Sequence, residues 1–82
     1  MNVDLFNQIK TFMSESLSIP IEKIEMNALL GEHLDMDSLD LVDIIIGFEE
    51  LFDIFIAEEE LPNMIFVKNI YDSVEYHLNN KD

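Results

Sequence analysis

Ser38 is the residue whose neighbours point most directly to chemistry. It lies in the acidic run Leu34-Asp35-Met36-Asp37-Ser38-Leu39-Asp40, with His33 upstream. A serine hydroxyl, a histidine base and an orienting aspartate form a hydrolytic site only where the three side chains converge in space. The sequence has no Gly-x-Ser-x-Gly elbow, and a lone loop histidine is more often simply exposed. We therefore expect that the chain is not an enzyme.

The acids around Ser38 also raise the question of a calcium loop, because Asp35, Asp37 and Asp40 cluster there. The calcium-loop pattern requires Asp or Asn where Leu39 stands and Gly where Asp40 stands. The pattern fails at both positions. We expect no dedicated metal site, although Mg²⁺ or Ca²⁺ can associate diffusely with so acidic a surface.

The same residues suit the start of a helix that runs from Ser38 to Leu51 or Phe52. Asp and Ser side chains cap free backbone N–H groups, and acids in the first turn complement the helix dipole. Taken alone, Ser38 is most simply explained as a helix cap. Capping does not exclude a second role as an attachment point.

This helix carries more apolar residues than one buried face requires. At roughly 100° per residue, one set falls within an arc about 120° wide and predicts the core face. That set is Leu41, Ile44, Ile45, Phe48, Leu51 and Phe52. A second stripe of Leu39, Val42 and Ile46 is flanked by Asp43 and Glu50 on one side and by Glu49 on the other. Either this stripe is buried too, or it is a partner-binding face, and acids are almost never buried unpaired.

Two further helices are expected to hold this one in place. Val3, Leu5, Phe6, Ile9, Phe12, Met13 and Leu17 recur at helical spacing near the N-terminus, and Pro20 ends that helix. The last helix begins near Val67 and places Val67, Ile70, Tyr71, Val74 and Leu78 on one face. His77, near its end, is expected at the surface.

The connections complete the predicted fold. A long loop reaches to about Asp37 and needs apolar residues to pin it to the core, for which Ile21, Ile24, Leu29, Leu30 and Leu34 are available. Residues 53–57 form a short link, and Glu58 to Leu61 is a short helical piece that Pro62 ends. We expect an all-α fold, a small four-helix bundle with three main helices, one short third helix and a long loop between helices 1 and 2. Residues 1–82 would form a single domain.

Charge and composition limit the kinds of partner that the chain can bind and the compartments in which it can occur. Eighteen acids and four lysines give a formal net charge of −14, and no Lys or Arg lies between Lys23 and Lys68. Such a surface repels nucleic acids and anionic membranes, and its central acids suit basic proteins. The start of the sequence does not resemble a signal peptide, and no apolar run approaches the roughly 18 residues of a membrane span. We expect a cytoplasmic monomer.

The segment from Leu34 to Val42 resembles the signature of acyl carrier proteins, in which the serine of an Asp-Ser-Leu motif opens the second helix. The similarity extends upstream over Ile24–Leu34 and downstream over Phe48–Ile56, and Val67, Ile70, Tyr71 and Val74 fit the last helix of that family. The resemblance therefore covers nearly the whole chain. Ala57, where a proline is common, Pro62, and Phe55, at an often polar position, depart from the family pattern.

The resemblance implies a carrier of acyl groups, most simply in fatty acid biosynthesis. Ser38 would bear a covalent 4′-phosphopantetheine arm, attached by a carrier-protein synthase that uses coenzyme A and Mg²⁺, with Asp37 as the acid before it. The core-facing residues would line a space for the acyl chain. Acyl-processing enzymes with basic docking patches would bind the recognition-helix positions, which are Leu39, Asp40, Val42, Asp43, Ile46, Glu49 and Glu50. A polyketide or specialised acyl carrier, or an acidic interaction module that is never modified, remain the alternatives.

Overall fold

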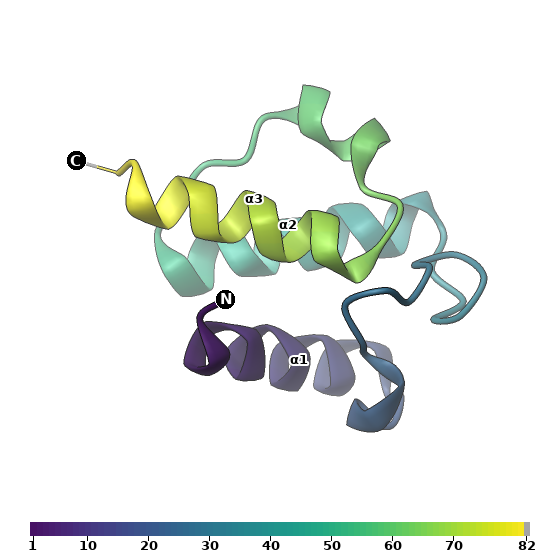
Figure 1. Cartoon of the computed structure of the whole chain (residues 1–82). Coiled ribbons are helices and arrows are strands. Elements are labelled where there is room, and N and C mark those ends of the chain that lie inside the picture. Colours follow the sequence, from purple (N-terminus) through teal and green to yellow (C-terminus); the bar gives the residue numbers. More distant parts are fainter. Residues whose placement is uncertain (82) are drawn as a thin grey trace.

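The computed structural model describes residues 1–81 and is a small helical bundle (Figure 1). Its elements are α1 (Val3–Leu17), η1 (Ile21–Lys23), α2 (Ser38–Phe52), η2 (Glu58–Asn63) and α3 (Val67–Asn79), where η marks a 3₁₀ helix. Within the described residues the only β-type pairing is an isolated bridge between Leu29 and Phe66. The expected bundle of three main helices with one short third helix is confirmed. Asp82, the last residue of the expected single domain, lies outside the described residues.

The core forms where α1 packs against both α2 and α3. The Phe12 ring of α1 lies 4.9 Å from the Phe48 ring of α2, and Phe6 meets Tyr71 of α3 edge-on at 6.0 Å. The predicted core faces of α2 and α3 are buried at Ile44, Ile45, Phe48, Val67, Ile70, Tyr71 and Val74. No helix in residues 1–81 has both the length and the apolar character to cross a membrane.

The long loop between α1 and α2 is held in place by core residues and by backbone pairing. Ile24, Leu30 and Leu34 are buried as predicted, whereas Ile21 opens η1 and is exposed and Leu29 is half-buried. The N–H of Leu30 donates to the carbonyl of Ile65 at 2.9 Å. The N–H groups of Val67 and Lys68 donate to the carbonyls of Ala28 and Met26, both at 3.0 Å. The loop is therefore paired with the start of α3.

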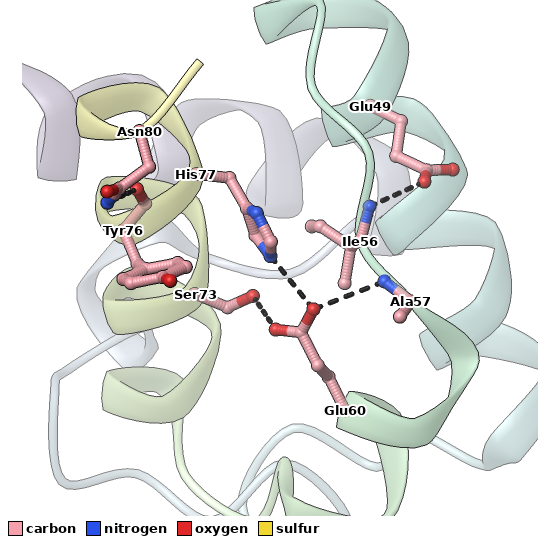
Figure 2. A network of polar contacts seen from close by, with 8 residues as sticks. All are labelled: Glu49, Ile56, Ala57, Glu60, Ser73, Tyr76, His77 and Asn80. Atoms are coloured by element: carbon pink, nitrogen blue, oxygen red, sulfur yellow. Dashed lines mark hydrogen bonds and ion pairs between the residues drawn. The ribbon is translucent and has the colours of Figure 1, made fainter.

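Two details were predicted wrongly, the end of the short third helix and the surroundings of His77. Pro62 does not end the short helix, because η2 continues through it to Asn63 as a 3₁₀ helix. His77 is not a free surface residue, because its Nε2 lies 2.8 Å from Oε2 of Glu60 in η2 (Figure 2). The same glutamate accepts hydrogen bonds from the Ser73 hydroxyl at 2.7 Å and from the Ala57 N–H at 3.1 Å. This network fixes the course of η2 against α3.

Two apolar residues predicted on buried helix faces are exposed. Val3, the first residue of α1, is 59% exposed, and Leu51 is 52% exposed. Leu51 lies at the edge of the predicted core arc, in the last turn of α2, where only Phe12 and polar residues of α1 line the surface beside it. Both errors occur near helix ends, where the neighbouring helix no longer covers the full arc.

Candidate functional site

Ser38 is the first helical residue of α2, and the capping role belongs to Asp37. Oδ1 of Asp37 accepts a hydrogen bond from the N–H of Asp40 at 2.8 Å, and Oδ2 of Asp40 accepts one from the N–H of Asp37 at 3.1 Å. This reciprocal capping box satisfies two backbone donors with side chains. The alternative in which Ser38 itself caps the helix is therefore excluded.

The arrangement leaves the Ser38 hydroxyl free beside two helix amides. Ser38 is exposed, and within residues 1–81 its hydroxyl forms no hydrogen bond. The amides of Asp40 and Leu41 are bonded to Asp37, whereas no hydrogen bond in the same part of the chain engages those of Ser38 and Leu39. Free N–H groups at a helix start favour a bound phosphate. Ser38 can therefore carry a phosphodiester without losing an existing contact.

An open pocket of about 350 Å³ adjoins Ser38. Its walls come from the long loop, from the first turns of α2 and from the link between η2 and α3. They are mainly apolar and comprise Leu29, Leu30, Gly31, Glu32, Met36, Asp37, Ser38, Leu41, Met64 and Ile65. An apolar group attached close to Ser38 can be withdrawn from water into this pocket.

The second apolar stripe of α2 lies on the surface. Leu39 is 74% exposed, Ile46 47% and Val42 39%, so the alternative in which the stripe is buried is excluded. The stripe starts beside Ser38 and continues along the helix. Exposed apolar residues aligned on one helix face, with acids beside them, are typical of a protein-binding surface.

The acids beside this stripe fall into two groups. Asp43 and Glu50 are exposed. Asp40 and Glu49 are half-buried and serve the fold, because Asp40 belongs to the capping box and Oε2 of Glu49 accepts the N–H of Ile56 at 2.8 Å (Figure 2). Within residues 1–81, none of these four acids forms an ion pair. Their negative charge therefore remains available to a basic partner.

The residues considered for other chemistry do not assemble into a site. Nδ1 of His33 accepts the N–H of Leu29 at 2.8 Å, so this nitrogen is occupied within the loop. In the part of the chain that the structure describes, no three acidic or histidine side chains are placed to hold a metal ion. Asp35 adopts the left-handed conformation, with φ 56°, and so shapes the turn that precedes Ser38.

Comparison with known proteins identifies the family. No protein-family model matches the chain. The acyl carrier protein of Buchnera aphidicola subsp. Baizongia pistaciae (strain Bp) is 38% identical over 71 residues, which is 87% of this chain and 91% of that protein. The acyl carrier protein of Phytoplasma mali (strain AT) is 36% identical over 78 residues, 95% of this chain and 93% of that protein. The chain belongs to the acyl carrier protein family.

For an acyl carrier protein, several features of the site were not predicted from the sequence. The match to the Phytoplasma mali protein covers 78 of the 82 residues, so it must include Ser38 and all of α2. Met36, Met64 and Ile65, however, had not been singled out as pocket residues, and Met64 and Ile65 belong to no motif. Met36 and Met64 are buried and Ile65 is exposed, and only their apolar character near the ends of predicted loops hinted at a role in the pocket. The structural role of Glu49 was likewise missed, because its partner Ile56 lies beyond the end of the helix.

Proposed function

We propose that this protein carries acyl groups as thioesters on a 4′-phosphopantetheine arm joined to the Ser38 hydroxyl. The observation that carries the proposal is the exposed Ser38 hydroxyl at the first position of α2. This hydroxyl is free because Asp37, and not Ser38, caps the helix. The membership of the chain in the acyl carrier protein family supports the same role. The sequence has no cysteine, so the thiol that forms the thioester would come from the arm.

The residues around Ser38 fit such an arm. The free amides of Ser38 and Leu39 favour the phosphate that links the arm to the protein. The neighbouring pocket is lined in part by Leu30, Met36 and Leu41, and an acyl chain that binds there would be removed from water. When bound, the arm supplies the reactive thiol. The protein supplies the attachment point at Ser38 and the apolar pocket beside it.

The exposed stripe Leu39-Val42-Ile46 and the acids beside it would bind the partner enzymes. These are a carrier-protein synthase, which adds the arm from coenzyme A with Mg²⁺, and acyl-processing enzymes with basic docking patches. Hydrophobic contact would supply affinity, and Asp43 and Glu50 would steer the encounter and set its register. Fatty acid biosynthesis in the cytoplasm is the proposed setting, with the carrier acting as a monomer.

The protein itself would perform no catalysis. His33 uses one ring nitrogen to accept the Leu29 amide, so that nitrogen cannot take a proton from Ser38. Ser38 would serve as a tether and not as a nucleophile in an active site of this chain. The reactions of the acyl group would take place in the partner enzymes.

Co-expression with a carrier-protein synthase and measurement of the intact mass test the proposal. We expect the wild-type protein to gain one phosphopantetheine group and Ser38→Ala to gain none. Ser16→Ala removes an exposed serine of α1 and should be modified like the wild type. If the wild type gains no mass under conditions that modify a known carrier, the proposal is wrong and an unmodified interaction module becomes the better explanation.

A further inference from the structure

Phe55 is a large aromatic residue on the surface that neither the fold nor the proposed arm site uses. It lies in the link between α2 and η2 and is 75% exposed. Its neighbours point inwards, since Ile54 packs against the core and Ile56 is only 4% exposed. The alternation means that anchoring Ile54 and Ile56 turns the Phe55 side chain outwards. Exposing a phenylalanine to this extent gives the free protein no packing energy.

The link that carries Phe55 is fixed against one side of α2. The N–H of Ile54 donates to the carbonyl of Glu49 at 3.2 Å, and the N–H of Ile56 donates to the Glu49 side chain at 2.8 Å (Figure 2). On the helical wheel, Glu49 lies about 20° from Val42 and about 60° from Ile46. Glu49 also lies about 40° from the buried Ile45 on its other side, so the link is attached at the border between the exposed stripe and the buried face of α2. Phe55 therefore adds exposed apolar surface next to this border, three residues beyond the C-terminal end of α2.

The charges near Phe55 indicate what kind of surface covers it. Glu50, Asp53, Glu58 and Glu59 are exposed acids within five residues of it in sequence. Lys81 lies at this end of α2, with its Nζ 3.0 Å from the carbonyl oxygen of Asp53 and 3.7 Å from Oδ2 of the same residue. An anionic membrane or a second copy of this chain would be repelled there. A basic protein surface with an apolar pocket is complementary to an aromatic residue surrounded by acids.

We propose that Phe55 is an additional anchor of the partner-binding face and inserts into an apolar pocket, bordered by Lys or Arg, on the acyl-processing enzymes that this carrier serves. This proposal rests on the proposed carrier function. A protein interface of standard size buries about 800 Å² on each partner, enough to reach from Ser38 along α2 to this link.

The test measures how an acyl-processing enzyme uses the loaded carrier. The wild type, Phe55→Ser, Phe55→Leu and Tyr76→Ser are each loaded with an acyl-phosphopantetheine arm, and loading is checked by intact mass. A purified bacterial fatty-acid condensing enzyme is the probe, and kcat and KM are measured for each carrier. Tyr76 is the matched control, an aromatic residue of α3 that is 61% exposed. Circular dichroism checks that every variant is folded.

We expect Phe55→Ser to raise KM about tenfold with kcat nearly unchanged, as for loss of one interface anchor. Phe55→Leu should restore most of the affinity, and Tyr76→Ser should behave like the wild type. A KM for Phe55→Ser within about twofold of the wild type would overturn the proposal, as would an equal loss in Tyr76→Ser. A dimer of the wild type that Phe55→Ser abolishes would assign Phe55 to self-association and also overturn it. Failure of the wild type to gain an arm would instead contradict the proposed function itself.

Discussion

Nε2 of His77 lies 2.8 Å from Oε2 of Glu60, and this contact joins α3 to η2 across seventeen residues of sequence. Burial alone would raise the pKa of Glu60. Hydrogen bonds from Ser73, His77 and the Ala57 N–H, together with the charge of His77, outweigh burial and hold the pKa below its usual value. The ionised carboxylate is therefore the form that stabilises the fold.

Glu60→Gln should lower the free energy of unfolding near neutral pH. The difference from the wild type should disappear at acidic pH. A carboxyl group whose pKa is depressed on folding stabilises the protein fully above its unfolded pKa, and the contribution disappears as the pH falls through the folded pKa. We expect a loss of about 1 kcal/mol near neutral pH, or about 4–8 °C in melting temperature. The difference from the wild type should disappear as the pH falls below 4.5, the ordinary pKa of a glutamate carboxyl group. Thermal melts across this pH range test it, with the exposed Glu59→Gln as control, and a gap that does not change with pH would contradict it.

The main helices were predictable because their apolar residues repeat at helical spacing. The bounds of α2 follow from the acids and serine at its start and from the periodicity up to Phe52. The link between Glu60 and His77 was not predictable in the same way. It joins residues far apart in sequence, and neither residue type nor spacing distinguishes this pair from exposed ones. The backbone pairing of Leu30 with Ile65 has no sequence signal for the same reason.

At the candidate site, the residue types predicted the exposed stripe. They did not predict which acids beside it stabilise the fold and which remain free. Asp43 and Glu49 look equivalent on a helical wheel, since each flanks the stripe. Their roles differ because Ile56 returns alongside α2 and offers Glu49 a backbone N–H. Likewise, Asp37 and Ser38 are both good capping residues, and only the actual start of the helix decides between them.

Asp37→Ala should destabilise the protein by removing the capping box. The change leaves the N–H of Asp40 without its side-chain acceptor and should cost about 1 kcal/mol. Asp43→Ala removes the same charge from an exposed position of α2 and serves as the control. Chemical denaturation compares the two, and equal stabilities would show that the capping box contributes nothing beyond its charge.

Gly47→Ala should destabilise the protein although alanine is the better helix former. A Cβ at Gly47 would overlap the Phe12 ring, which is held against Phe48 with ring centroids 4.9 Å apart. Overpacking of this kind costs about 1–3 kcal/mol, against a gain of about 1 kcal/mol in helix propensity. In the background of Phe12→Ala, which removes the ring, Gly47→Ala should be neutral or stabilising. Denaturation of all four proteins gives the coupling energy, and additive effects would contradict a direct clash.

Added salt should raise the melting temperature. The net charge of −14 makes like charges repel in the compact state, and most of the acids lie in one central stretch. Salt shortens the range of this repulsion to about 10 Å at 0.1 M, and Mg²⁺ should act at lower concentrations than NaCl because of its double charge. Melts from low to moderate ionic strength test the expectation, which an unchanged melting temperature would contradict.

Reversing single charges on α2 should separate partner binding from folding. Asp43→Lys and Glu50→Lys alter exposed acids beside the stripe, so helicity should stay unchanged while KM for a carrier-protein synthase rises several-fold. Glu15→Lys makes the same change on an exposed position of α1 and should leave KM close to that of the wild type.

Glu49→Lys should behave differently from both, because it also removes the acceptor that holds the N–H of Ile56. Losing a partner for a buried donor costs about 1–3 kcal/mol, so this variant should melt at a lower temperature as well as bind more weakly. Circular dichroism melts and synthase kinetics on the four variants distinguish the two effects. If Asp43→Lys or Glu50→Lys lost the fold, these acids would be part of the structure and not of a docking face. If Glu49→Lys melted like the wild type, the hydrogen bond to Ile56 would contribute little to stability.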